Sequence, residues 1–169
     1  MIEQSNHSRN ETPKIDLDRI DCGILRALQN DARISNKQLA SEVGLSPSSC
    51  LERVRKLERC GVLKGFHAEI EPKAVGIALQ AMVTVRITQH SRETFVDFRE
   101  YALALPEVIA LYQVAGADDF MLHIAARDTS HLHDLVLDHL VTQDEVSHLE
   151  TALIFNYRRA PLTPMYVAT

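Results

Sequence analysis

The 169-residue sequence has no long hydrophobic run, and none of its apolar stretches approaches the roughly 18 residues that a membrane-spanning helix requires. The N-terminus also lacks the basic segment followed by an apolar segment that is typical of a signal peptide. We therefore expect a cytoplasmic protein with no membrane partner. Hydrophobic residues at 46% and charged residues at 24% are typical of one soluble globular domain or two small ones.

Cysteine is also scarce, and Cys22, Cys50 and Cys60 form no C-x-x-C pair. An odd number of widely spaced cysteines excludes a disulfide-stapled scaffold and a cysteine-rich zinc site of the usual spacing. Cys50 falls on the apolar side of a predicted helix. We therefore interpret it as a small core residue rather than a redox switch.

The sequence contains no G-x-S-x-G, P-loop or H-E-x-x-H motif and no paired nucleophile and base. His131, Asp134 and Asp138 share one side of a predicted helix, which invites interpretation as a metal site. That side points away from the predicted core, so we interpret it as solvated surface. We expect no catalytic residue, no metal ion and no cofactor.

Negative charge exceeds positive charge by five, but the two signs are unevenly distributed. The segment from Lys14 to Lys64 carries ten basic and seven acidic residues, a net charge of +3. The segment from Gly65 to Thr169 carries seven basic and fourteen acidic residues, a net charge of −7. This difference is either chance variation between solvated surfaces or a sign that only the first segment approaches a polyanion.

Residues 1–14 are polar, show no apolar repeat and are predicted to form a disordered tail. Residues 15–64 follow with three helical patterns in close succession, which predicts a compact helical domain. The first pattern consists of apolar residues at helical spacing: Leu17, Ile20, Ile24, Leu25 and Leu28.

Local capping signals define the second and third predicted helices. Ser35 and Gln38 form a capping box at the start of the second helix, and Gly44 is predicted to end it. Ser46 is predicted to cap the third helix, with Pro47 at the first helical position, where a missing N–H is tolerated.

The turn between these two helices is typical of a helix-turn-helix, because Ala40 lies at the helix crossing and Gly44 at the turn. On the third helix, Cys50, Val54 and Leu57 form a stripe that is predicted to be buried. The opposite side carries hydroxyls near its start and cations farther along. A recognition helix reads base edges with its N-terminal residues and contacts phosphates through Arg and Lys. The alternative interpretation is an ordinary helical hairpin with a solvated basic surface.

We predict that this surface binds double-stranded DNA. Arg53 lies at the edge of the buried stripe, and serine and glutamate read bases ambiguously, so the target sequence is not defined. The predicted DNA-binding residues are Ser35, Asn36, Lys37, Ser46, Ser48, Ser49, Glu52, Arg53, Arg55 and Lys56.

A second block follows the helical domain. Residues 65–78 are predicted to form a linker strand, because Phe66 and Ile70 alternate with polar residues. Residues 79–160 contain strands and helices in the order β-α-β-β-α-β, the ferredoxin-like arrangement. Residues 161–169 are predicted to form a C-terminal tail. The predicted fold class is therefore α+β.

Two features of the second block suggest binding. Helices cover one face of such a sheet, and the apolar side chains of the other face favour a partner subunit. A homodimer also suits a helix-turn-helix, which reads paired half-sites. The turn Gly116-Ala117-Asp118-Asp119 could bind a free amino acid, with backbone N–H groups at the carboxylate and an aspartate at the ammonium group; a plain hairpin turn is the alternative.

Over residues 15–158 the chain resembles the Lrp/AsnC (feast/famine) family of transcriptional regulators. Three segments carry the resemblance: LDRIDCGILRALQNDARIS, QLASEVGLSPSSCLERVRKLERCGVLKGFHAEIEP and VAGADDFML. The resemblance implies a winged helix-turn-helix, a linker strand and a ferredoxin-like effector domain. It further implies homodimers that often assemble into octamers, and an amino-acid effector bound between dimers.

Carried over by position, the resemblance implies effector contacts at Gln113, Val114, Ala115, Gly116, Asp118, Asp119, Ala152 and Ile154. Gly116 and Asp119 match the G-x-x-D turn of the family, whereas Ala117 stands where many members carry a polar residue. The sequence therefore predicts a DNA-binding transcriptional regulator modulated by a small effector. An architectural DNA-wrapping protein without an effector is one alternative. A ferredoxin-like enzyme is another, although no catalytic pair is apparent.

Overall fold

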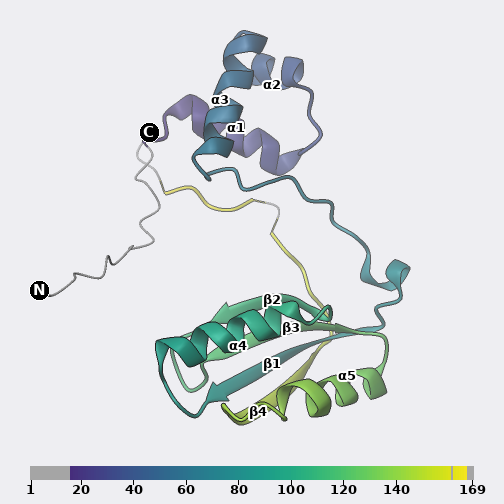
Figure 1. The fold of residues 1–169 in the computed structure, drawn as a ribbon. Coiled ribbons are helices and arrows are strands. Elements are labelled where there is room, and N and C mark those ends of the chain that lie inside the picture. The colour runs from purple at the N-terminus through teal and green to yellow at the C-terminus, as the bar shows by residue number, and fades with distance from the viewer. Residues whose placement is uncertain (1–15, 161, 167–169) are drawn as a thin grey trace, which may run out of the picture. The chain divides into compact units, whose positions relative to one another are not determined.

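The structure is a computed structural model, and it describes residues 16–160 and 162–166. The chain divides into two compact units, one comprising the chain up to Ala68 together with the segment from Arg159, the other running from Glu69 to Arg158 (Figure 1). The predicted disordered tail of residues 1–14 lies outside the described residues, as does part of the predicted C-terminal tail.

The first unit contains three helices: α1 (Arg19–Asn30), α2 (Asn36–Val43) and α3 (Pro47–Arg59). Their apolar faces meet in one cluster, and the prediction of three closely spaced helices is confirmed. The buried members of this cluster are Ile24, Leu28, Leu39, Ala40, Cys50 and Leu57.

Local hydrogen bonds fix the helix ends. The Ser35 hydroxyl accepts from the Gln38 N–H at 3.3 Å, and the Ser35 N–H donates to the Gln38 side chain at 3.2 Å. The Ser46 hydroxyl accepts from the Ser49 N–H at 3.3 Å. Gly44 has a φ of 70°, a left-handed conformation that glycine adopts without a side-chain clash. The predicted caps and turn are therefore confirmed.

The prediction of a linker strand at 65–78 is wrong for the described chain. Residues 65–71 form neither helix nor strand, and a short 3-10 helix, η1 (Pro72–Val75), follows. A strand is stabilised by ladder hydrogen bonds to a neighbour, and no described segment pairs with 65–71. The described residues of the first unit likewise contain no strand, so they form no β-wing.

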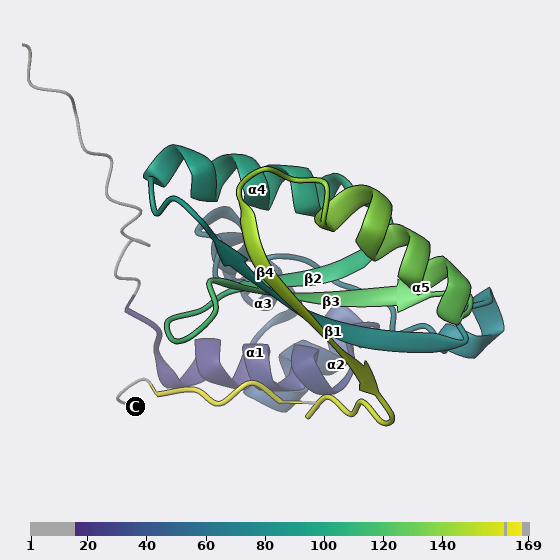
Figure 2. The same ribbon diagram turned by 90° about the horizontal axis from the view of Figure 1, so that it is seen from below.

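The second unit has the predicted βαββαβ order. Its elements are β1 (Leu79–Ile87), α4 (Arg92–Ala104), β2 (Val108–Gln113), β3 (Phe120–Ala126), α5 (Thr129–Leu135), the π-helical turn η2 (Val136–Leu140) and β4 (Val146–Ile154). The strands form one antiparallel sheet in the order β2-β3-β1-β4. Helices α4 and α5 lie on the same face of this sheet (Figure 2).

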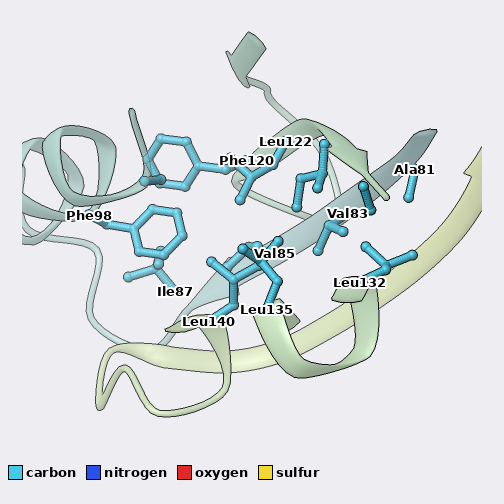
Figure 3. Packing of buried hydrophobic residues seen from close by; sticks show 13 residues of the cluster. Ala81, Val83, Val85, Ile87, Phe98, Phe120, Leu122, Leu132, Leu135 and Leu140 are labelled. Carbon is cyan, nitrogen blue, oxygen red and sulfur yellow. The ribbon is translucent and has the colours of Figure 1, made fainter. Parts of the chain in front are cut away.

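The core of the second unit lies between the sheet and its two helices (Figure 3). Val83, Val85 and Ile87 point into it from alternate positions of β1, and Phe98 of α4 meets Phe120 of β3 with ring centroids 5.0 Å apart. Burial of each large side chain contributes roughly 1.5–3 kcal/mol. This packing supports the β2–β3 turn, which carries most of the predicted effector residues.

Within the second unit, none of the described helices packs on the other face of the sheet. This face carries half-buried Met82, Thr84 and Met121 and the buried His123, whose ring lies 5.3 Å from that of Tyr157. His123 Nε2 is 2.8 Å from the side-chain oxygen of Gln80. Burial lowers the pKa of His123, because the apolar surroundings disfavour the imidazolium form.

Candidate DNA-binding helix and effector turn

Helix α3 presents polar and apolar residues on opposite sides. Cys50 and Leu57 are fully buried, and burial raises the pKa of the Cys50 thiol, which makes it a poor nucleophile. The opposite side is exposed, and its predicted DNA-binding members are Ser48, Ser49, Glu52, Arg55 and Lys56. The orientation predicted for α3 is therefore confirmed.

The N-terminus of α3 gathers three hydroxyl groups. Ser46 Oγ lies 3.1 Å from Ser48 Oγ and 3.0 Å from Ser49 Oγ. Free backbone N–H groups and the helix dipole make such a terminus attractive to a phosphate. All three serines are exposed, so the hydroxyls can exchange these mutual hydrogen bonds for bonds to a ligand.

Two cations follow about two turns farther along the same helix. Arg55 and Lys56 are exposed, and neither forms an ion pair with another described residue. A cation without a carboxylate partner can bind phosphate without first breaking an internal contact. The exposed side of α3 therefore combines hydroxyls with two available positive charges.

Arg53 differs from its neighbours, because its guanidinium is engaged inside the unit. Its Nη1 lies 2.6 Å from Asp18 Oδ2 and 2.9 Å from Asp21 Oδ1, two carboxylates at the start of α1. The Asp21 N–H, together with Arg53, holds the pKa of Asp18 below its ordinary value. Asp21 is buried, so Arg53 neutralises a carboxylate that water does not solvate. Arg53 thus ties α3 to α1, a role that the sequence prediction missed.

The residues predicted at the start of α2 also divide by role. The Asn36 side chain donates to the Pro47 carbonyl at 2.8 Å, which fixes the start of α2 against the start of α3. Ser35 is occupied by its capping box. Lys37 is exposed and forms no ion pair with another described residue. Of the three, Lys37 is the residue with a charge available for DNA.

One hydrogen bond closes the turn between β2 and β3 at its base, and a second joins the turn to β1. The Val114 N–H donates to the Asp119 carbonyl at 2.9 Å, and the Asp119 N–H donates to the Val85 carbonyl at 3.0 Å. Among the described residues, no acceptor receives the N–H groups of residues 115–118. Gly116 has a φ of 155°, which favours glycine, and no atom lies within 4 Å of where a Cβ would stand. Consecutive free N–H groups in a turn favour an anion such as a carboxylate.

The two aspartates of the turn are already bonded. Asp119 Oδ2 accepts from the Ile87 N–H at 2.8 Å, and its Oδ1 lies 3.1 Å from His90 Nε2. Asp118 Oδ1 lies 3.4 Å from the Arg86 guanidinium, whose Nε donates to the Ala117 carbonyl at 2.6 Å. Sequence reasoning missed Arg86 and His90, because no local pattern links them to a turn about thirty residues away.

The structure brings together only part of the predicted effector set. Residues 113–119 form one turn, but Ala152 pairs with Met82 and Ile154 pairs with Gln80 near the start of β1. The turn bonds to Val85 and Ile87 at the opposite end of β1. At about 3.3 Å per residue, the β1 partners of Ala152 and Ile154 lie roughly 10–23 Å along the strand from Val85 and Ile87. Within one chain, Ala152 and Ile154 do not reach the turn.

The residues His131, Asp134 and Asp138, on α5 and η2, also have identifiable surroundings. His131 is half-buried, and its Nε2 lies 3.3 Å from Glu107 Oε1, which differs from the solvated position predicted for it. Asp134 and Asp138 are exposed. Across the described residues, no three metal-ligating side chains converge.

Comparison with known families decides between the interpretations of these two units. The AsnC-type helix-turn-helix domain matches residues 17–58, and the Lrp/AsnC ligand binding domain matches residues 80–159. The chain belongs to the Lrp/AsnC family of transcriptional regulators. This Lrp/AsnC chain therefore has a DNA-binding helix-turn-helix and a ligand-binding domain, and its family consists of regulators rather than enzymes.

Individual relatives support the assignment along most of the chain. AldR, an HTH-type transcriptional regulator of Mycolicibacterium smegmatis, is 45% identical over 144 residues, which cover 85% of this chain and 84% of that protein. The leucine-responsive regulatory protein of Escherichia coli K12 is 36% identical over 142 residues, which cover 84% and 87% of the two chains.

Solved structures show the same fold in relatives. The crystal structure of a Neisseria meningitidis transcriptional regulator in complex with L-Met has a TM-score of 0.78 and 30% identity, covering 85% of this chain and 93% of that one. The AldR structure of Mycobacterium tuberculosis also has a TM-score of 0.78, with 38% identity and coverages of 89% and 99%. In the described part of this Lrp/AsnC chain, no helix has the length and hydropathy needed to cross a bilayer.

Proposed function

We propose that this Lrp/AsnC regulator binds specific DNA sites through α3 and that a free amino acid modulates this binding. The observation that carries the proposal is the exposed side of α3, where a capped N-terminus with three hydroxyls precedes two cations that no described carboxylate neutralises. This arrangement suits base reading at the start of the helix and phosphate binding farther along.

The contacts differ in what they do. Ser48, Ser49 and Glu52 face base edges and set sequence preference, whereas Arg55 and Lys56 bind phosphates of any sequence. Ser46 presents the N-terminus of α3 to a phosphate, and Ser35, Asn36 and Lys37 place the start of α2 near the backbone. Arg53 acts indirectly, by holding α3 against α1.

Binding assays at several salt concentrations test this proposal. Arg55→Ala and Lys56→Ala are each expected to weaken binding to all DNA sequences and to reduce the salt slope by about one. Arg92→Ala, an exposed cation of α4 in the second unit, is the matched control and is expected to leave binding unchanged. Unchanged affinity in both α3 variants would contradict the proposal.

The β2–β3 turn supports the amino-acid part of the proposal. The free N–H groups of residues 115–118 suit the carboxylate of an amino acid, and Asp118 or Asp119 suits the ammonium group after exchange of its present partner. The relative crystallised with L-Met favours this ligand class. Isothermal titration against the twenty amino acids tests the site, and the absence of binding heat from all of them would count against it.

The uncovered face of the sheet supports assembly of this chain into a homodimer and of dimers into an octamer. Met82 and Met121 lie on this face, and the Thr84 hydroxyl is buried there without a hydrogen-bond partner among the described residues. A second subunit packed on this face would bury the apolar side chains from water. It would also supply a second α3 for a paired half-site. Light scattering measures the mass of the assembly, and a monomer would refute this part of the proposal.

An architectural protein that wraps DNA without an effector is the second candidate, because phosphate contacts alone bind any sequence. Gel shifts with selected and scrambled DNA, each with and without amino acids, separate the two candidates. Equal affinity for both DNAs and no response to any amino acid would favour the architectural protein.

A further inference from the structure

One apolar side chain of the helix-turn-helix points outward. Among the large hydrophobic residues of α1, α2 and α3, Leu51 alone is exposed, with 38% of its surface accessible. It is also absent from the cluster of apolar side chains that holds the three helices together. Packing within this unit therefore leaves more than a third of the Leu51 surface open to a partner.

Two exposed neighbours of Leu51 belong to the DNA-binding surface. Val54 adjoins Leu51 on the apolar side of α3. On the exposed side, residues three and four positions away place Leu51 beside Ser48 and Arg55. Leu51, Ser48 and Arg55 are all exposed. Leu51 thus lies at the border of the polar surface, next to the hydroxyl that is proposed to face base edges and the cation that is proposed to bind phosphate. It also lies in the first half of α3, the part of a recognition helix that reaches the bases.

The chemistry of the major groove identifies a partner for such a side chain. Base edges present hydrogen-bond donors and acceptors, and the C5-methyl of thymine is their apolar group. We propose that Leu51 packs against the C5-methyl of a thymine in the major groove and so favours T·A over C·G at that position. This inference rests on the proposed DNA-binding role of α3 and adds a specificity-determining contact to it.

The methyl group itself provides the test. DNA fragments selected from a random pool by the wild-type protein are amplified with either dTTP or dUTP, which gives the same sequences with and without thymine methyls. The wild-type protein is expected to bind the uracil form about fourfold more weakly for each methyl group that Leu51 contacts. In Leu51→Ala, the two forms are expected to bind with equal affinity, and the thymine form more weakly than with the wild type.

Matched variants exclude other causes. Leu103→Ala removes an exposed leucine of α4, and it is expected to keep the wild-type ratio between the two DNAs. Leu51→Met retains an apolar contact and is expected to keep most of the ratio, whereas Leu51→Gln, of similar length, is expected to lose it. Equal binding of both DNAs by the wild type, or an unchanged ratio in Leu51→Ala, would overturn the inference.

Failure of this inference can be distinguished from failure of the proposed function. If Arg55→Ala weakens both DNAs equally while Leu51→Ala keeps the full ratio, α3 binds DNA and Leu51 does not read thymine. If Arg55→Ala, Lys56→Ala and Leu51→Ala all leave both affinities unchanged, α3 is not the DNA-binding helix. Circular dichroism and oligomer mass, measured on each variant, show whether folding or assembly has changed instead.

Discussion

On α3, Arg55 and Lys56 are exposed and form no ion pair with another described residue, whereas on the β2–β3 turn Asp118 and Asp119 are already bonded to Arg86, Ile87 and His90. If α3 binds DNA as proposed, the first unit presents cations that need not leave another partner first. The second offers backbone N–H groups that are free and carboxylates that must exchange partners.

This difference matters for regulation. A ligand that binds to Asp118 or Asp119 must replace hydrogen bonds or ion pairs that join the turn to β1 or to His90. Binding at this turn would therefore change contacts within the second unit. The DNA contacts proposed for Arg55 and Lys56 require no comparable exchange, because neither cation forms an ion pair with another described residue. The charged groups of the β2–β3 turn must therefore change partners to bind a ligand, whereas Arg55 and Lys56 of α3 need not.

Arg53→Ala is expected to have the largest effect on stability. It tests whether Arg53, unlike the exposed Arg55 and Lys56, stabilises the fold. Its loss leaves Asp21 buried without its cation, and we expect the free energy of unfolding to fall by roughly 2–3 kcal/mol in chemical denaturation. Arg59→Ala, an exposed residue of the same helix, is the control and should change it by less than about 0.5 kcal/mol. Equal effects of the two substitutions would show that Arg53 has no structural role.

Asp119→Ala should have the next largest effect, because it removes the acceptor of the Ile87 N–H and the partner of His90. We expect a loss of about 1–2 kcal/mol in unfolding free energy, since a half-buried N–H then lacks its partner. Hydrogen exchange of the Ile87 amide is the direct measurement. Unchanged protection of this amide would mean that the carboxylate is held for a ligand rather than for the fold.

Mild acid should distinguish the two units. The folded state keeps the pKa of His123 below its ordinary value of 6.5, so the unfolded chain takes up the proton first as pH falls. Stability of the second unit should therefore decrease below about pH 6.5, by up to about 1.4 kcal/mol per pH unit.

The first unit should respond at lower pH. The pKa of Asp18 is depressed below its ordinary value of 3.8, so its contribution is present above that value and is lost as pH falls through the folded pKa. Hydrogen exchange measured separately in each unit checks both statements. His123→Gln should reduce the pH dependence of stability in the second unit, and His133→Gln, at an exposed position, should not.

Asp118→Asn is expected to have the smallest effect on stability, within about 0.5 kcal/mol, because its contact with Arg86 is long and half-exposed. The sharper measurement is amino-acid binding. If Asp118 receives the ammonium group, the affinity of the Asp118→Asn variant for the amino acid should fall while its unfolding free energy stays nearly unchanged. Unchanged affinity would leave Asp119 and the backbone as the binding groups.

Local chemistry explains which features were predictable from the sequence. The capping box of Ser35 and Gln38, the left-handed Gly44 and the cap at Ser46 each involve residues at most four positions apart. The exposed side of α3 follows from helical periodicity alone. Such features do not depend on the rest of the fold.

The missed features depend on distant segments. Arg53 pairs with carboxylates more than thirty residues earlier, and Arg86 pairs with Asp118 thirty-two residues later. Ala152 is predicted to face the same effector cleft as the β2–β3 turn, and within one chain the register of β4 against β1 places it away from that turn. Phe66 and Ile70 alternate as in a strand, yet this segment has no described neighbour to complete a ladder. The periodicity of the sequence indicates on which face of a helix or strand a side chain lies, but it does not identify the distant residue that the side chain contacts.

The guanidinium of Arg53 has a mechanical consequence. It anchors the middle of α3 to the first turn of α1, and Arg55 lies only two residues beyond this anchor. These ion pairs restrain the middle of α3 relative to the start of α1. If α3 binds DNA as proposed, the restraint lies along the helix between its N-terminal serines and Arg55, so it helps to keep both groups in one fixed orientation.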